Sequence, residues 1–324
     1  METMKAIYCT KYGSTEDLQL IEIDKPVPTK NELLVKVKAT AVNDYDWSLV
    51  SGKPFVYRLL FGLRKPKNPI PGMELSGVVE DVGSGVTLFK VGDEVYGDIS
   101  NYGFGSFAEY ICINEKAVML KPADMSFTDA ASIPHASMLA YQAIVEKGNI
   151  KDGQTVLING AGGGVGNFGL QIAKQFDVTV MGVDAGDKFA MMKTTGFDEC
   201  IDYTKEDFTK NGQRYNLVID AKTNRSPLAF LRSLHKNGKY VTVGGKVGRL
   251  LQLLILKFWI RIFTNKRLII VALKPNRDLE YINNLYAAGK IKPVIDGPYS
   301  FSEIRKAIQH FGEGKHKGKV VIIV

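Results

Sequence analysis

The chain has 324 residues, which is too long for one ordinary hydrophobic core and predicts two domains. Hydrophobic residues make up 45% and charged residues 23% of it, proportions typical of a soluble globular protein rather than a disordered or fibrous one. The net charge is +8, but residues 246–274 carry seven Lys or Arg and no Asp or Glu, so the remainder carries only 8 − 7 = +1. Because the basic charge is local, a chain-wide field for nucleic acid is excluded and no nucleic-acid partner is expected.

The three cysteines Cys9, Cys112 and Cys200 lie far apart and form no CxxC pair. An odd, scattered count fits reduced thiols rather than a disulfide framework or a structural zinc loop. The first ten residues lack the apolar core of a secretory signal. We therefore expect a cytoplasmic protein.

Roughly the first 120 residues contain short β-runs and no long helical period. Residues 32–42 alternate between apolar and polar over much of their length, and three further short runs at 76–83, 92–97 and 107–113 contain or adjoin glycine. This pattern predicts a mostly antiparallel β domain with a folded-over or barrel-like sheet.

The pattern changes at Ser126, a predicted helix cap that is followed by helical spacing as far as Val145. Strand-like and helix-like segments then alternate from residue 154 to residue 245, which predicts a parallel, doubly wound sheet with right-handed crossovers. Two helices at 277–291 and 301–314 and a last strand at 318–324 follow, and they are interpreted as a return to the first domain.

The strongest chemical signal is the turn in "LINGAGGGVGNFGLQIAK", where a strand ends at Asn159 and a helix begins near Gly164. Small residues there allow a pyrophosphate to approach the backbone amides, and the helix N-terminus supplies unpaired N–H groups and a positive dipole end. No Gly-Lys-Ser/Thr follows, which disfavours a P-loop. The turn predicts dinucleotide binding, with a merely structural turn as the alternative. The residues predicted to hold the diphosphate are Ala161, Gly163, Gly164, Val165 and Gly166.

Asp184 ends the second strand of this region, 18 positions after Gly166. An acidic residue there accepts hydrogen bonds from the adenosine ribose of NAD and would repel the 2′-phosphate of NADP. Lys188 follows four residues later and would attract that phosphate, and the alternative role for Asp184 is a helix cap near Asp187. NAD against NADP stays open, with a modest lean to NAD.

These motifs, in this order, resemble those of the medium-chain dehydrogenase/reductase superfamily. Residues 71–97 are similar to its G-x-E-x-x-G-x-V signature followed by a V-G-D-x-V strand, residues 41–52 to its substrate-side loop, and residues 131–144 to the helix that enters its nucleotide domain. The match covers nearly the whole chain.

The resemblance implies an α/β protein of two domains. A GroES-like, β-barrel-type catalytic domain would span residues 1–125 and be completed by about 272–324. A Rossmann dinucleotide-binding domain would span residues 126–271.

In the zinc alcohol dehydrogenases of this superfamily, a His precedes the signature Glu and a Cys occupies the place of Asn43. Here those positions hold Met73 and Asn43, and a thioether and a carboxamide are poor zinc ligands. The chain therefore resembles the zinc-free quinone oxidoreductase branch, which implies an NAD(P)H-dependent reductase of quinones or α,β-unsaturated carbonyls without zinc. The alternatives are a non-enzymatic, crystallin-like nicotinamide-dinucleotide-binding protein and an alcohol dehydrogenase-like enzyme.

The same resemblance implies the catalytic residues. Asn43 and Asp46 match positions that line the substrate cleft, where Asn43 would donate a hydrogen bond to a developing oxyanion; the alternative is that both fix the loop. Tyr57 is a weak candidate for the proton donor. Glu74 and His135 are expected to serve structure. The aromatic residues expected either to face a flat quinone or to pack in the core are Tyr45, Trp47, Phe55, Tyr57 and Phe61.

Further cofactor contacts are implied in the second domain. Tyr203 and Lys188 match positions that hold the 2′-phosphate in NADPH-using relatives, and Gly244 is also assigned to the cofactor site. Leu139 stands where the superfamily usually has a Thr that helps to hold the nicotinamide, which puts one contact in doubt.

Residues 249–263 are apolar nearly all round, interrupted by Lys257 and Arg261. A helix of this length reaches only about 20 Å, too short to cross a membrane. It would cover the substrate cleft, pack at a dimer interface or rest weakly on an acidic membrane surface. The strand that follows, at 266–273, is an expected sheet edge for homodimerisation.

Overall fold

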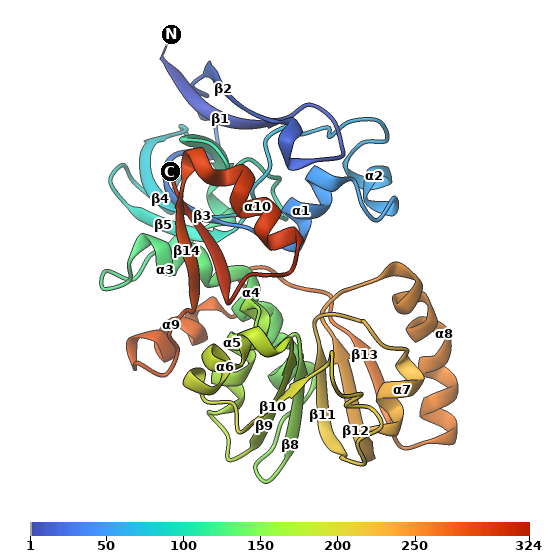
Figure 1. The fold of residues 1–324 in the computed structure, drawn as a ribbon. Helices are drawn as coiled ribbons and strands as arrows, with labels where there is room; N and C mark the ends of the chain where they lie inside the picture. Colours follow the sequence, from blue (N-terminus) through green and yellow to red (C-terminus); the bar gives the residue numbers. More distant parts are fainter. Residues whose placement is uncertain (1) are drawn as a thin grey trace. The chain divides into compact units, whose positions relative to one another are not determined.

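The computed structural model describes residues 2–324, except for the side chain of residue 60. These residues form two compact units (Figure 1). The first unit holds the residues up to His135 together with Pro275–Asn283 and Ile295–Val324, and the second holds Ala136–Lys274 and Asn284–Val294. The sequence suggested divisions at 125 and about 272, whereas the contacts place them after His135 and after Lys274. The short second excursion at Asn284–Val294 was not anticipated.

The first unit is built on a seven-stranded sheet in the order β14-β15-β3-β4-β5-β7, with β6 also paired to β3. Every pair in it is antiparallel except β14 with β15, so the prediction of a mostly antiparallel sheet is confirmed. A separate hairpin joins β1 (Thr3–Cys9) to β2 (Leu18–Asp24). The strands of the large sheet are β3 (Glu32–Ala41), β4 (Glu74–Val82), β5 (Glu94–Asp98), β6 (Tyr110–Asn114), β7 (Met119–Leu120), β14 (Ile295–Ser300) and β15 (Lys319–Ile323).

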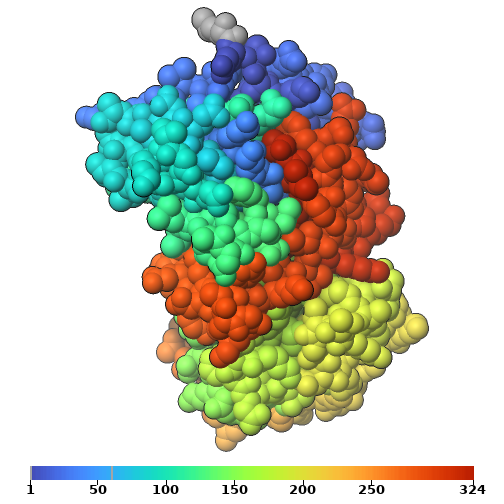
Figure 2. Space-filling view, turned by 90° about the vertical axis from the view of Figure 1, so that its left-hand side faces the viewer, coloured from blue at the N-terminus to red at the C-terminus, as the bar shows by residue number. Residues whose placement is uncertain are grey.

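Strand β15 joins the C-terminal part of the chain to its first fifty residues. It pairs with β3 at Val321↔Ala41, and residues from the two ends of the colour scale meet on the surface in Figure 2. The alternation of β3 puts Leu33, Val35 and Val37 into one core, because successive side chains of a strand point to opposite faces.

The helices that flank this sheet differ from the prediction in two respects. Helices α1 (Asp44–Ser51) and α2 (Val56–Phe61) were not foreseen. The helix predicted from Ser126 to Val145 is instead divided into α3 (Phe127–Ser132), α4 (Pro134–Tyr141) and a π-helical turn (Gln142–Lys147), because Pro134 has no N–H to continue α3. The Ser126 cap is confirmed, since its Oγ accepts from the Asp129 N–H at 3.0 Å. The C-terminal helices are α9 (Leu279–Ala287) and α10 (Ile304–Gly312).

The second unit is a six-stranded, fully parallel sheet in the order β10-β9-β8-β11-β12-β13. Counted along the chain this order is 3-2-1-4-5-6, and the predicted Rossmann fold is confirmed. The order reverses between β8 and β11, and ligands of such sheets bind at this point, outside the carboxyl ends of the strands. The strands are β8 (Thr155–Asn159), β9 (Thr179–Asp184), β10 (Glu199–Asp202), β11 (Tyr215–Asp220), β12 (Leu234–Thr242) and β13 (Arg267–Ile270).

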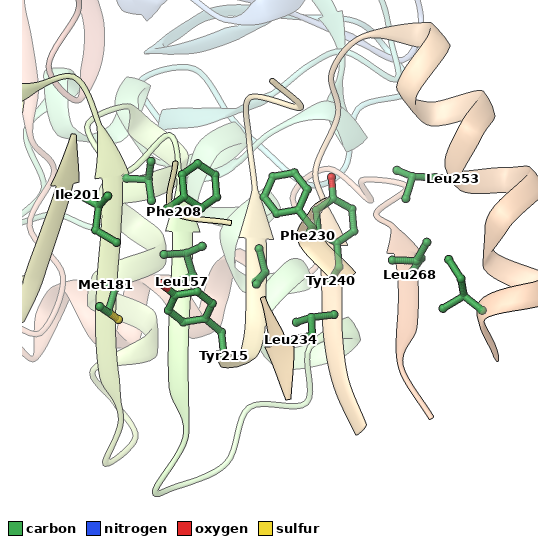
Figure 3. Packing of buried hydrophobic residues seen from close by; sticks show 13 residues of the cluster. Leu157, Met181, Ile201, Phe208, Tyr215, Phe230, Leu234, Tyr240, Leu253 and Leu268 are labelled. Carbon is green, nitrogen blue, oxygen red and sulfur yellow. The ribbon is translucent and has the colours of Figure 1, made fainter. Parts of the chain in front are cut away.

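The core of the second unit is apolar and aromatic, as Figure 3 shows. Phe230 lies between Phe208 and Tyr240, with ring centroids 5.8 and 4.7 Å away. The helix after Ser226 is short, because Leu234 already belongs to β12 and pairs with Tyr215 of β11. The helices of this unit are α5 (Gly164–Ala173), α6 (Phe189–Thr195), α7 (Pro227–Arg232) and α8 (Val247–Phe263).

Candidate functional site

The turn after β8 is shaped by glycines that no larger residue could replace. Gly160 has φ +91°, in the left-handed region. A Cβ at Gly166 would lie 2.4 Å from the carbonyl oxygens of Gly160 and Ala161, so α5 packs directly on the turn. A Cβ at Gly162 would lie 2.4 Å from the side chain of Lys188. The missing side chains thus allow α5 and the side chains of Lys188 and Lys222 to pack closely against the turn.

The first turn of α5 supplies the donors. Gly163 is the N-cap and has no side chain to occupy the helix end, and Gly164 and Val165 are half-buried rather than covered. The leading N–H groups of a helix have no partner within it, and the helix dipole makes this end positive. The turn and the helix end together are suited to the diphosphate of a nicotinamide dinucleotide. The residues that could hold it are those predicted from the sequence, Ala161, Gly163, Gly164, Val165 and Gly166.

Asp184 at the end of β9 is tied to this turn. Its Oδ2 accepts from the Gly162 N–H at 2.9 Å, its Oδ1 accepts from the Ala185 N–H at 2.9 Å, and Lys188 Nζ lies 3.5 Å from Oδ1. Both side chains are buried, and burial lowers the pKa of Lys188 although Asp184 opposes the shift. Asp184, which the sequence predicted as the ribose acceptor, thus also anchors the glycine turn, and Lys188 compensates its negative charge. It caps no helix, since the helical turn Gly186–Lys188 has Ala185 as its cap.

Tyr203 and Gly244 lie at the same edge of the sheet. Tyr203 follows β10, its backbone N–H reaches the Asp184 carbonyl at 3.4 Å, and its ring is 39% exposed. Gly244 follows β12 with φ +154°. Lys222 is a cation that the sequence analysis missed: its side chain lies against the turn, 3.0 Å from where a Gly160 Cβ would stand.

A second missed residue, Asp220, links the strand ends at the point where the strand order reverses. Its Oδ1 accepts from Asn159 Nδ2 at 2.8 Å and from the Thr223 N–H at 2.9 Å, and its Oδ2 accepts from the Tyr240 hydroxyl at 2.6 Å. Burial raises the pKa of Tyr240 far above its usual range, so the phenol stays a donor. Asp220 could have been identified from the sequence as an acidic residue that ends a predicted strand of the nucleotide-binding region.

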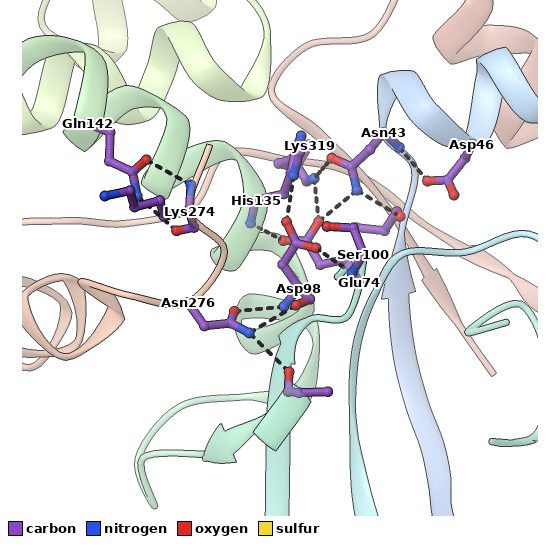
Figure 4. Close-up of polar contacts among 12 residues, drawn as sticks. Asn43, Asp46, Glu74, Asp98, Ser100, His135, Gln142, Lys274, Asn276 and Lys319 are labelled. Atoms are coloured by element: carbon purple, nitrogen blue, oxygen red, sulfur yellow. Dashed lines mark hydrogen bonds and ion pairs between the residues drawn. The ribbon is translucent and has the colours of Figure 1, made fainter. Parts of the chain in front are cut away.

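The first unit holds a buried polar network around Glu74 (Figure 4). Its Oε2 accepts from Lys319 Nζ at 2.7 Å and from Asn43 Nδ2 at 2.9 Å, and its Oε1 accepts from the His135 N–H at 2.7 Å. Lys319 Nζ also donates to Asn43 Oδ1 at 2.6 Å. The structural role expected for Glu74 agrees with these contacts, while Lys319, the first residue of β15, was missed because it is 245 positions away.

His135 extends this network to Asp98, with 2.7 Å between Nδ1 and Oδ2. Burial alone would lower the pKa of His135, but the hydrogen bond with Asp98 and the negative charges of Asp98 and Glu74 together outweigh burial, so the pKa is raised. Burial alone would likewise raise the pKa of Asp98, yet the contact with His135 and Ser100 lowers it. The contact thus favours the imidazolium form of His135 and the carboxylate form of Asp98.

The side chains of Asn43 and Asp46 already form hydrogen bonds within the first unit. Asp46 accepts from the Asn43 N–H at 2.8 Å and from the Gly72 N–H at 3.0 Å, and burial raises its pKa to about 7. The Asn43 carboxamide serves Glu74 and Lys319, and its other hydrogen-bonding contact is the Ala41 carbonyl at 3.4 Å. These contacts favour the loop-fixing alternative for both residues over an oxyanion donor.

Tyr57 lies in an aromatic cluster with Tyr45 and Phe61. The Tyr57 ring stacks on Phe61 with centroids 5.7 Å apart, and Tyr45 meets Tyr57 edge-on at 5.7 Å. Burial raises the pKa of Tyr57, and none of the described residues hydrogen-bonds its hydroxyl, which is thus a protonated and unengaged donor. Trp47 and Phe55 do not join the cluster: Trp47 packs against α10, and Phe55 is 61% exposed.

Within residues 2–324, no group of three or more His, Cys, Asp or Glu side chains could hold a metal ion. Met73, at the signature position discussed above, is fully buried.

Comparison with known proteins matches both parts of the chain to family models. Residues 29–123 match the alcohol dehydrogenase GroES-like domain, and residues 195–322 match a model described as zinc-binding dehydrogenase. A 2-methylene-furan-3-one reductase from Solanum lycopersicum is 35% identical over 98% of this chain and 79% of its own length. A quinone-oxidoreductase homolog of Spinacia oleracea chloroplasts is 30% identical over 98% of both chains. The solved quinone oxidoreductase of Coxiella burnetii superposes with a TM-score of 0.88 at 28% identity over 100% of both chains. The chain belongs to the medium-chain dehydrogenase/reductase superfamily, in its quinone oxidoreductase branch.

Proposed function

We propose that this protein is an NAD(P)H-dependent reductase that transfers a hydride to a quinone or an α,β-unsaturated carbonyl. The observation that carries the proposal is the glycine turn that opens onto the N-terminus of α5 at the reversal point of a parallel sheet. The relatives named as enone and quinone reductases support the acceptor class.

The bound nicotinamide would supply the hydride. The amides of Gly164 and Val165 would hold the diphosphate of the cofactor, and Asp184 keeps the turn in place by accepting a hydrogen bond from the Gly162 N–H. An activated acceptor spreads the incoming charge onto its oxygen. A donor that is protonated at neutral pH can stabilise that oxygen.

Tyr57 is the residue we propose for this donor role, in preference to Asn43. Its hydroxyl is unengaged by the described residues and its pKa is raised, whereas the Asn43 carboxamide is committed to Glu74 and Lys319. Asn43 and Asp46 then act as positioning residues for the loop that leads into α1. The rings of Tyr45 and Phe61 offer an apolar surface for a flat acceptor.

We propose that NADPH binds more tightly than NADH, against the modest lean of the sequence. The Asp184 carboxylate is neutralised by Lys188 and already accepts two backbone bonds, so its repulsion of a 2′-phosphate is weakened. Lys222 then adds positive charge beside the turn, and Tyr203 borders it.

We also propose a homodimer and a reducing compartment such as the cytoplasm. Strand β13 ends the parallel sheet, and among the described residues it pairs with β12 alone, which leaves an edge that a second copy could extend symmetrically. The three cysteines are free thiols, as expected for reducing surroundings.

The test is oxidation of NADPH and NADH by the purified protein with a panel of quinones and enals. We expect turnover with NADPH above NADH, and a Tyr57→Phe variant with kcat lowered by about 10²-fold at a nearly unchanged KM. The matched control is Tyr102→Phe, an exposed tyrosine outside the cluster. Tight cofactor binding without turnover on any acceptor would instead identify a non-enzymatic binding protein.

The cofactor preference is tested separately by fluorescence titration of both cofactors. Lys222→Gln should weaken NADPH about tenfold and leave NADH within about twofold, because only NADPH carries the extra phosphate. An equal loss for both cofactors would contradict the assignment of Lys222 to the 2′-phosphate.

A further inference from the structure

Helix α8 has two apolar faces, of which only one is used by the fold. Leu253 and Ile260 are buried in the core of the second unit, and Leu250 and Leu256 pack against the same core. The opposite face remains uncovered by the described residues. Its members are Leu251, Leu254, Ile255, Phe258, Trp259, Ile262 and Phe263, each between 48% and 75% exposed.

These seven residues form a continuous stripe. They follow one another at steps of three and one, so that residues three and four apart stand on the same side of the helix. Trp259 stacks on Phe263 with centroids 6.0 Å apart, and Phe258 meets Trp259 edge-on at 5.8 Å. A stripe of this size on the surface marks an interaction site rather than scattered exposure.

The charges beside the stripe select its partner. Lys257 and Arg261 lie one turn apart, between the buried and exposed faces of the helix, and Arg267 follows the helix. All three side chains are exposed, and none forms an ion pair with a described residue. Residues 246–274 contain no acidic residue at all. A second copy meeting this face through a two-fold axis would bring the same cations together, whereas an anionic bilayer would attract them.

The dimensions suit a helix that lies in the plane of a bilayer surface. Its 17 residues span about 26 Å, and within residues 2–324 no helix is long and apolar enough to cross a membrane. Lys and Arg at the border of an apolar stripe keep their charged ends among headgroups while their stems lie along the hydrocarbon boundary. An exposed Trp and flanking aromatic rings favour the same boundary.

We infer that α8 docks this protein on anionic membrane surfaces, with the stripe Leu251 to Phe263 in the headgroup region and Lys257 and Arg261 on anionic lipid headgroups. Such docking would bring the reductase to acceptors that dissolve in lipid. The inference does not require the proposed chemistry, because the binding surface needs neither cofactor nor acceptor.

The experiment is flotation of the full-length protein with phosphatidylcholine vesicles that contain or lack phosphatidylglycerol. We expect binding to the anionic vesicles, weakened by salt, and little binding to the neutral ones. The triple variant Ile255→Gln, Phe258→Gln, Ile262→Gln should bind at least about a hundredfold more weakly, since three large side chains no longer enter the apolar region. The pair Lys257→Gln, Arg261→Gln should lose about fivefold per charge. All five side chains are exposed, so the fold is expected to survive.

A spectroscopic measurement identifies the face that binds. Anionic vesicles should shift the emission of Trp259 to shorter wavelength, and Trp259→Phe should abolish the shift while Trp47 still emits. A triple variant that floats as well as the parent protein would overturn the inference. A second outcome would also overturn it: the parent protein binds no vesicles, and light scattering shows that the parent is a dimer while the triple variant is a monomer. The stripe would then be an interface between two copies of the chain. Turnover of a water-soluble acceptor, measured in parallel, reports on the proposed chemistry independently.

Discussion

At the scale of single residues, Lys319 is the group on which the first unit's buried charges depend. Its ammonium meets the Glu74 carboxylate at 2.7 Å, and both side chains are almost fully buried. Charges removed from water are tolerated only when they are paired and hydrogen-bonded. Glu74 meets this condition with three donors from three different elements.

Lys319→Met should therefore lower the free energy of unfolding by about 3–5 kcal/mol, because it leaves a buried carboxylate without its counter-charge. The control is Lys317→Met, an exposed lysine two residues earlier, for which a change within about 0.5 kcal/mol is expected. Urea unfolding of both variants measures the difference. A loss below about 1 kcal/mol for Lys319→Met would show that Glu74 is held by its other donors.

His135 should make the stability of the protein depend on pH in a defined direction. Because its folded pKa is raised, the folded state holds the proton more tightly than the unfolded state, so its contribution is full below the ordinary pKa of about 6.5 and is lost as pH rises through the folded value. The stability difference between the parent and His135→Gln should thus be largest below about pH 6.5 and shrink as the pH rises above it. The substitution His235→Gln, at an exposed histidine, serves as the control. A difference that grows with pH would reverse the assignment.

The site residues divide by how local their signals are. Gly166 and Asp184 were predictable because the turn, the helix and the second strand follow within one βαβ unit. Lys319 was not predictable, since its partner Glu74 lies on a distant strand and no local spacing encodes the pairing. Asp220 could have been noticed as an acidic residue at a strand end, but its bond from Asn159 could not, because Asn159 lies on another strand. The sequence also could not show that Asn43 is fully engaged, because that depends on Lys319.

At the scale of secondary-structure elements, the seating of α5 on β8 depends on Gly166. The Cβ of Gly166→Ala would meet two backbone oxygens at 2.4 Å, so α5 must move away from the turn. We expect a loss of about 2 kcal/mol in stability and a cofactor Kd raised about tenfold or more. Gly248→Ala in α8 is the matched control: nothing lies within 4 Å of its Cβ, and it should stabilise by about 0.4–1 kcal/mol. Equal effects of the two substitutions, measured by unfolding and titration, would contradict this packing argument.

The elements found correctly from sequence are those with strong periodicity and clear ends. The parallel strands β8, β9 and β11 are short buried runs bounded by turn signals. Helices α1 and α2 were missed because they are six to eight residues long and one of them contains mixed polar and apolar residues without a clear stripe. Helix α7 ends at Arg232 because the pairing of Leu234 with Tyr215 of β11 overrides the local helical pattern.

At the scale of the whole molecule, the two units should respond unequally to cofactor. The glycine turn, Asp184, Lys188 and Lys222 all belong to the second unit. A saturating cofactor at about 100 times its Kd adds about 2.7 kcal/mol to the stability of the state that binds it. Hydrogen exchange with NADPH should therefore show the largest gain in protection in α5 and the ends of β8 and β9. A gain confined to the seven-stranded sheet would place the cofactor elsewhere.

The pairing of Glu74 with a partner 245 positions away also bears on biosynthesis. At about 5–20 residues per second, the ribosome adds Lys319 roughly 12–50 s after Glu74. During that interval the carboxylate has no ammonium and β3 lacks the neighbour β15, while all strands of the parallel sheet have already been made. The second unit can thus form its parallel sheet before synthesis ends, whereas the first unit, although its sequence is translated first, can complete its sheet only after β15 has been made.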